Sequence, residues 1–77
     1  MEDFILTTKL KELRASKNLS QEDLANLVGV RRETIARLEK GIYNPSLKVA
    51  MDIAKVFDKT VEEIFFFEEH NNTSVRE

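Results

Sequence analysis

The chain has 77 residues, of which 42% are hydrophobic and none is cysteine. This length allows one domain with a small core, and the lack of cysteine excludes disulfide bonds and thiolate metal sites. No apolar stretch is as long as a membrane span, and no basic segment precedes an apolar run near the N-terminus. We therefore expect a cytoplasmic protein rather than a secreted or membrane protein.

Charge is distributed unevenly along the chain, although the net charge is only -2. Residues 9–48 contain nine basic and five acidic side chains, whereas residues 52–77 contain three basic and seven acidic ones. Such asymmetry allows one face to attract nucleic-acid phosphates while the rest stays anionic. An ordinary mixed surface has the same composition, so charge permits nucleic-acid binding without establishing it.

Three helices are predicted in the first half of the chain. Leucines at helical spacing indicate a first helix over residues 8–17. Ser20, with Asp23 three residues later, predicts a capped second helix, which ends at Gly29 because glycine tolerates the positive φ of a tight turn. The third helix begins at residue 31 or 32 and ends at Gly41.

Two further helices are predicted in the second half. After a loop that contains the only proline, Ser46 is expected to cap a fourth helix with a broad apolar stripe. Thr60 and Glu63 have the spacing of a capping box and predict a short fifth helix. The polar residues 71–77 have no periodicity, so we expect a frayed tail after a single domain of residues 1–70.

Short apolar runs stand near both ends of the chain, at residues 4–6 and 65–67. Neither run has the spacing of the helices between them. Two interpretations remain open: the runs are strands that pair with each other, or they form a dimerisation surface. A surface of this kind would consist of Ile64, Phe65, Phe66 and Phe67, since so many aromatic side chains cannot all be buried in a small domain.

The second and third helices have the pattern of a tight bihelical unit. Ala25 is small enough to let the helices approach, Gly29 permits the turn, and Ile35 and Leu38 pack the third helix against the second. The outer face of the third helix carries Arg32, Glu33, Ala36, Arg37 and Lys40. Protruding side chains with strong hydrogen-bonding groups suit the base edges of a DNA major groove.

These residues resemble the Cro and phage-repressor helix-turn-helix family, also known as the xenobiotic-response-element family. The matching segments are LSQEDLA at residues 19–25, GV at 29–30, TI at 34–35, LEKG at 38–41 and YNPS at 43–46. The resemblance implies an all-α, five-helix lambda-repressor-like domain, here with the possible addition of a small two-stranded sheet from the chain ends. It also implies a transcriptional regulator, acting as a repressor, whose homodimer inserts the helix near residues 31–40 into the major groove of a palindromic operator.

The resemblance also implies roles for individual residues. The expected phosphate contacts are Ser20, Gln21, Arg31, Thr34, Lys40, Tyr43 and Asn44. The candidates for base contacts are Arg32, Glu33 and Arg37, because arginine pairs with guanine edges and glutamate accepts from the cytosine amine. The positions of Arg14 and Glu39 form a partly buried ion pair in related repressors, so these two residues are expected to be structural.

Several of these residues have a second interpretation. Many family members have a capping serine or threonine at the position of Arg31, which cannot cap in that way. Many also have glutamine at the position of Glu33, and this glutamate either binds cytosine or forms a solvated pair with Arg37. Ser20 is either a cap alone or a phosphate contact as well, and Tyr43 contacts phosphate or covers the core.

Other functions are less consistent with the sequence. The only histidine, His70, stands in the polar tail, and no nucleophile–base pair, phosphate-binding glycine loop or metal-ligand spacing occurs. We therefore expect no enzyme activity, cofactor, metal or small-molecule ligand. The expected partners are double-stranded DNA and a second copy of the chain. The alternative is a protein-interaction module or an antitoxin-type subunit with the same fold.

Overall fold

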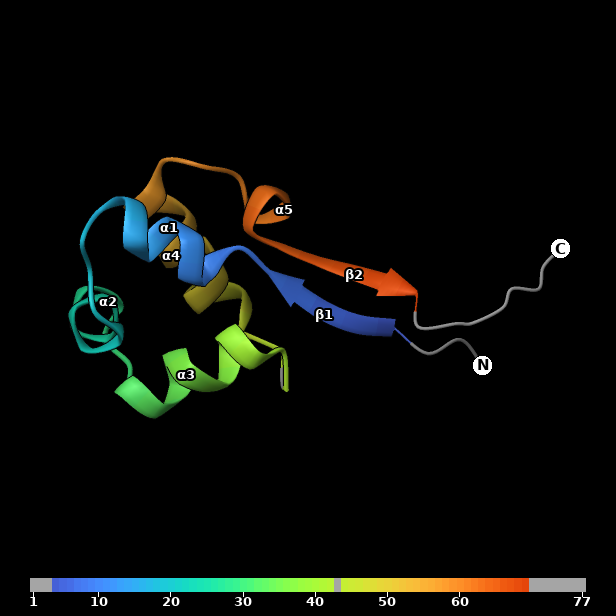
Figure 1. Ribbon diagram of the computed structural model, residues 1–77, viewed down its shortest axis with the longest axis horizontal. Coiled ribbons are helices and arrows are strands. Elements are labelled where there is room, and N and C mark those ends of the chain that lie inside the picture. The colour runs from blue at the N-terminus through green and yellow to red at the C-terminus, as the bar shows by residue number, and fades with distance from the viewer. Residues whose placement is uncertain (1–3, 43, 70–77) are drawn as a thin grey trace, which may run out of the picture.

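The computed structural model describes residues 4–42 and 44–69, so Tyr43 and the predicted tail lie outside the described residues. Within these ranges the chain forms five helices and two strands (Figure 1). Their order is β1 (Phe4–Thr8), α1 (Leu10–Ser16), α2 (Gln21–Val28), α3 (Arg32–Lys40), α4 (Leu47–Phe57), α5 (Val61–Ile64) and β2 (Phe65–Glu69). None of the helices in the described part is long and apolar enough to cross a membrane.

The two chain ends form an antiparallel sheet of two strands, which confirms the first of the two interpretations of the apolar runs. The sheet extends as a ribbon away from the helices (Figure 1). Helix α1 begins at Leu10 rather than at residue 8, because Thr8 pairs with Phe65 in the sheet. The amide of Lys9 continues this pairing by donating to the carbonyl of Ile64 at 2.9 Å.

The hydrophobic core lies between the helices and the base of the ribbon. Every helix and both strands contribute to it, with side chains at the helical spacing expected for one buried face. Its members are Leu6, Leu10, Leu24, Ala25, Ile35, Leu38, Ala50, Ile53, Ala54, Phe57, Ile64 and Phe65. The core therefore joins the first strand to the last one and fixes both against the helix-turn-helix.

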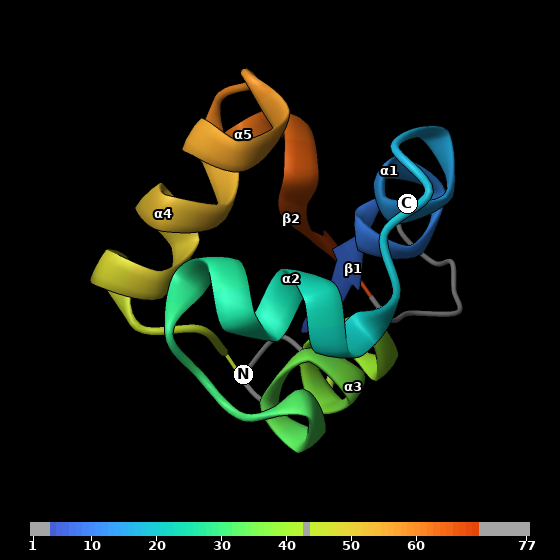
Figure 2. The ribbon, with the colours of Figure 1, turned by 90° about the vertical axis from the view of Figure 1, so that its left-hand side faces the viewer.

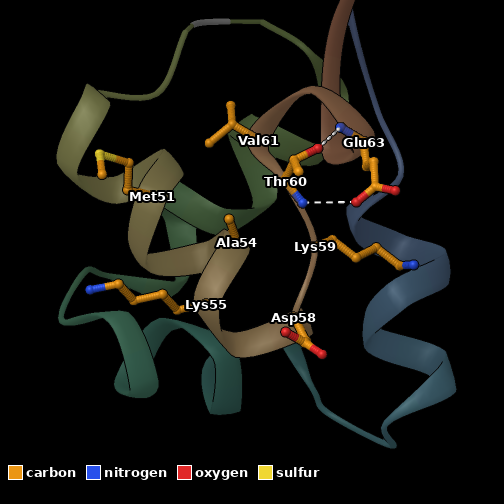
Figure 3. A pocket seen from close by; sticks show the side chains of 8 residues that line it. All are labelled: Met51, Ala54, Lys55, Asp58, Lys59, Thr60, Val61 and Glu63. Carbon is orange, nitrogen blue, oxygen red and sulfur yellow. Dashed lines mark hydrogen bonds between the residues drawn. The ribbon is translucent and has the colours of Figure 1, made fainter.

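The predicted caps at Ser20 and Thr60 are both present, and each is a complete capping box. The Ser20 hydroxyl accepts from the Asp23 amide at 2.9 Å, and the Asp23 carboxylate accepts from the Ser20 amide at 2.9 Å. Thr60 and Glu63 make the same reciprocal pair at the start of α5, with distances of 3.2 and 2.8 Å (Figure 3). This second box stands beside an open groove between α4 and α5. Each box satisfies amides that the first helical turn would otherwise leave without partners.

Candidate nucleic-acid interface

The interface is built on the close packing of α2 against α3. Figure 2 shows α2 lying across α3, while the outer side of α3 faces away from the other helices. Ala25, Ile35 and Leu38 fill the contact and are at most 1% exposed. Gly29 ends α2 with φ +74°, and the amide of Val30 closes the turn by donating to the Ala25 carbonyl at 3.0 Å. The inner face of α3 is thus buried against α2, and this contact fixes the position of the outer face.

The predicted DNA-contacting side chains of α3 are mostly exposed. Arg32, Glu33, Arg37 and Lys40 are exposed, and Thr34 is half-buried. Among the described residues, ion pairs form between Arg14 and Glu39 and between Lys48 and Asp52, but not between Glu33 and Arg37. The structure therefore gives no support to the interpretation of Glu33 and Arg37 as a mutual ion pair.

Arg31 occupies the N-cap position of α3. Its backbone is extended, with φ -84° and ψ +155°, and its side chain makes no capping hydrogen bond. This agrees with the expectation that arginine, which has no acceptor atom, cannot replace the capping hydroxyl. The amide of Thr34 donates to the Arg31 carbonyl at 3.0 Å, whereas the amides of Arg32 and Glu33 precede the first helical hydrogen bond and would suit a phosphate.

The start of α2 supplies a second group of candidate phosphate contacts. Ser20 is exposed and Gln21 is half-buried, and Asn44 is exposed in the loop after α3. The Ser20 hydroxyl uses its acceptor capacity in the cap, so its hydrogen remains for donation to an anion. Capping and phosphate contact are therefore compatible at this residue. The predicted contact by Tyr43 lies outside the described residues.

Arg14 and Glu39 form the ion pair implied by the resemblance, and it links α1 to the end of α3. Besides the contact of its Nε, Arg14 donates from Nη2 to Oε1 of Glu39 at 3.1 Å and from Nη1 to the Leu19 carbonyl at 2.9 Å. The hydrogen bond to Glu39 raises the pKa of Arg14 above its ordinary value. The pair and the bond to Leu19 tie α1, the segment before α2 and the end of α3 together.

Two further hydrogen bonds, which residue spacing did not predict, connect this pair to the outer face of α3. Gln21 donates from Nε2 to Oε1 of Glu39 at 3.1 Å, and Arg32 donates from Nη1 to Oε1 of Gln21 at 3.3 Å. The partners stand 18 and 11 residues apart. No periodic pattern relates such positions, because their contact depends on how α3 crosses α2.

The predicted dimer surface is divided by the fold. Ile64 is completely buried and Phe65 is 7% exposed, because both pack into the core at the base of the ribbon. Neither side chain is accessible to a partner in this conformation. Phe66 is half-buried, whereas Phe67 is 56% exposed, and Ile5 on β1 is 48% exposed. The exposed apolar side chains of the ribbon therefore lie in its outer part and not at its base.

A helix-turn-helix family model matches residues 10–64, which span α1 to α5. The chain belongs to this helix-turn-helix family. An uncharacterized HTH-type transcriptional regulator of Archaeoglobus fulgidus is 59% identical over 64 residues, which are 83% of this chain and 90% of that protein. The CTXphi phage transcriptional repressor RstR of Vibrio cholerae is 31% identical over 87% of this chain and 60% of its own length.

A solved structure of a helix-turn-helix protein has the same arrangement. The restriction-modification controller protein C.AhdI of Aeromonas hydrophila matches with a TM-score of 0.64 and 41% identity, over 70% of this chain and 82% of its own. The Archaeoglobus fulgidus and Vibrio cholerae relatives are named as transcriptional regulators, a class of proteins that is not enzymatic.

Proposed function

We propose that this chain is a sequence-specific DNA-binding repressor that binds a palindromic operator as a homodimer. The observation that carries the proposal is the outer face of α3, where Arg32, Glu33, Arg37 and Lys40 are exposed together on a buried support. A helix of this kind fits the major groove, and its arginines suit the O6 and N7 atoms of guanine. The relatives named as transcriptional regulators and as a phage repressor support the same function.

Phosphate contacts on both sides of α3 would position the helix in the groove. Ser20 caps α2 and Gln21 begins it. Arg31 precedes α3, Lys40 ends α3, and Asn44 lies in the loop that follows. Contacts from these donors to phosphate do not distinguish one base sequence from another, but they set the register of the protein on the duplex. Each such contact releases counterions, so affinity should fall steeply as salt rises.

Dimerisation through the ribbon would complete the operator-binding unit. Two strands alone are marginally stable in water, and this ribbon exposes Phe67 and Ile5 in its outer part. Phe67 shares a face with its partner Leu6, and Ile5 lies on the opposite face because side chains alternate along a strand. A second copy packed against the face of Phe67 would bury that side chain and place the two copies of α3 about 34 Å apart, one DNA turn. An inverted repeat is the operator that matches such two-fold symmetry.

A DNA selection from a random library tests the proposal directly. We expect the purified protein, at near-physiological salt, to recover an inverted repeat with half-sites about one helical turn apart. Folded protein that recovers no motif would contradict the proposal and favour a protein-interaction module. A motif without inverted symmetry would contradict the homodimer while leaving sequence-specific binding in place.

Arg37→Ala tests the base-contact assignment on α3. The variant should lose about 1–3 kcal/mol of discrimination at one base pair of the recovered motif, because a guanidinium contact to guanine is removed. Competition binding with singly substituted operators measures this. Lys48→Ala, on α4 and outside the assigned contacts, serves as the control for charge. Equal weakening of Arg37→Ala on all sequences would reassign this residue to phosphate.

A further inference from the structure

Four side chains form a continuous series of hydrogen bonds from a partly buried ion pair to the outer face of α3. Arg14 donates to Glu39, Gln21 donates to Glu39, and Arg32 donates to Gln21. We call this series the relay. It begins at an ion pair whose side chains are 14% and 9% exposed and ends at an exposed arginine that is a candidate for base contact.

The chemistry of Glu39 determines which way the amide of Gln21 faces. A carboxylate can only accept hydrogen bonds, whereas an amide has one donating and one accepting end. Gln21 must therefore direct Nε2 to Glu39, at 3.1 Å, and this leaves Oε1 for Arg32 at 3.3 Å. If the amide were reversed, its NH₂ group would face the guanidinium, which has no acceptor, and the contact to Arg32 would be lost.

The upstream half of the relay is well anchored. Arg14 binds both oxygens of Glu39 and also the Leu19 carbonyl at 2.9 Å, which lies just before α2. Gln21 is the first residue of α2, so Arg14 fixes the segment that carries it. An exposed arginine otherwise samples many rotamers, and ordering it on binding reduces affinity. A side chain oriented in advance avoids part of that loss.

We propose that Glu39 is a positioning residue for DNA recognition, which acts through Gln21 to orient Arg32 toward one base pair. The inference rests on the proposed function and deepens it, because it assigns to a partly buried ion pair an effect on sequence preference. Arg14 supports Glu39 in this role, and neither residue needs to touch DNA.

Base preference measured for Glu39→Gln gives the first test. A neutral amide at position 39 no longer forces the orientation of Gln21, so discrimination should fall at the base pair that Arg32 contacts and at no other. One bidentate arginine contact supplies about 5- to 150-fold discrimination, and we expect most of it to be lost. Thr60→Ala is the matched control, since it removes a helix cap far from α3 and lowers stability without affecting the relay.

Gln21→Leu provides a second test that leaves the ion pair intact. Gln21 is half-buried, so this variant should fold even if Glu39→Gln does not. It removes both hydrogen bonds of the amide and the proposed phosphate contact of Gln21. Affinity should therefore fall on all sequences, and discrimination should fall in addition at the same base pair as in Glu39→Gln. In an Arg32→Ala background, neither substitution should change base preference further, because the oriented side chain is already absent.

The outcomes distinguish failure of the inference from failure of the proposed function. If the wild-type protein selects a motif and both relay variants keep its full preference, the inference is overturned. It is also overturned if Glu39→Gln weakens binding equally on all sequences, as Thr60→Ala would through reduced stability. If the wild-type protein selects no motif, the proposed function fails first, and the role of the relay fails with it.

Discussion

Gly29 and Gly41 both end a helix of the helix-turn-helix with positive φ, +74° and +70°, but their surroundings differ. A Cβ atom at Gly29 would meet no other atom within 4 Å, whereas a Cβ at Gly41 would lie 2.2 Å from the Leu6 carbonyl oxygen. Gly29 is therefore required by backbone conformation alone. Gly41 is required also by the close approach of β1 to the end of α3.

We predict that Gly41→Ala destabilises the protein more than Gly29→Ala. The left-handed conformation should cost each variant about 1–2 kcal/mol. Gly41→Ala should lose a further 1–3 kcal/mol, by the usual order of magnitude for overpacking, because backbone atoms of β1 must move. Urea unfolding of both variants measures the difference. Equal losses would indicate that β1 adjusts without strain and that the ribbon is not fixed to α3.

At the scale of the elements, two acidic side chains accept hydrogen bonds in the capping boxes. The Ser20 amide holds the pKa of Asp23 below its ordinary value, and the Ser20 hydroxyl adds to this. The Thr60 amide lowers the pKa of Glu63 in the same way. The start of α2 and that of α5 therefore depend on ionised carboxylates.

The sign of the pH dependence follows from these lowered pKa values. The unfolded chain binds protons at these carboxylates before the folded chain does, so their contribution to stability is complete above the unfolded pKa values. It is lost as the pH falls from about 5 through the lowered pKa values of the folded state. Thermal melts of Asp23→Asn/Glu63→Gln should show a weaker acid destabilisation than wild type.

Glu62→Gln is the control for this measurement, since Glu62 stands in the first turn of α5 but takes no part in the box. The melting temperature of Glu62→Gln should fall with decreasing pH as that of the wild type does. If the double variant and the wild type lose stability in parallel between pH 5 and pH 3, the acid sensitivity of the fold does not arise from the caps.

At the scale of the whole molecule, the ribbon is buried at its base and leaves apolar side chains exposed in its outer part. Its base is buried through Leu6 and Phe65, while Phe67 is 56% exposed and Ile5 48% exposed. Leu6 also lies against Gly41, so the ribbon is joined to the end of α3. A dimer formed through the ribbon would hold the two recognition helices in a defined relation.

We predict that Phe67→Asp converts a homodimer to monomers. A buried carboxylate in an apolar interface is unfavourable, and the exposure of Phe67 means that the protomer core is not disturbed. Light scattering coupled to gel filtration measures the mass. Leu47→Asp, at a side chain of α4 that is 74% exposed, makes the same chemical change elsewhere and should remain dimeric. Loss of the dimer in Leu47→Asp but not in Phe67→Asp would indicate that the interface lies on α4.

The sequence by itself determined the five helices and most of their ends, although α1 begins two residues later than predicted because Thr8 belongs to the sheet. The capping boxes at Ser20 and Thr60, the turn at Gly29 and the uncapped start of α3 at Arg31 all depend on atoms a few residues apart. Apolar spacing likewise indicated Ile35 among the core residues. Interactions of such short range are encoded in local order, and for this reason they could be predicted without the fold.

Only the tertiary structure decided how the two ends of the chain pair with each other and how the recognition surface is completed. The strands β1 and β2 pair although they stand at opposite ends of the sequence. With this pairing, Ile64 and Phe65 are buried in the core and are not accessible to a partner. The link from Glu39 to Arg32 through Gln21 likewise requires that α2 and α3 cross at one angle. Contacts of this kind depend on the packing of distant segments, which residue spacing does not encode.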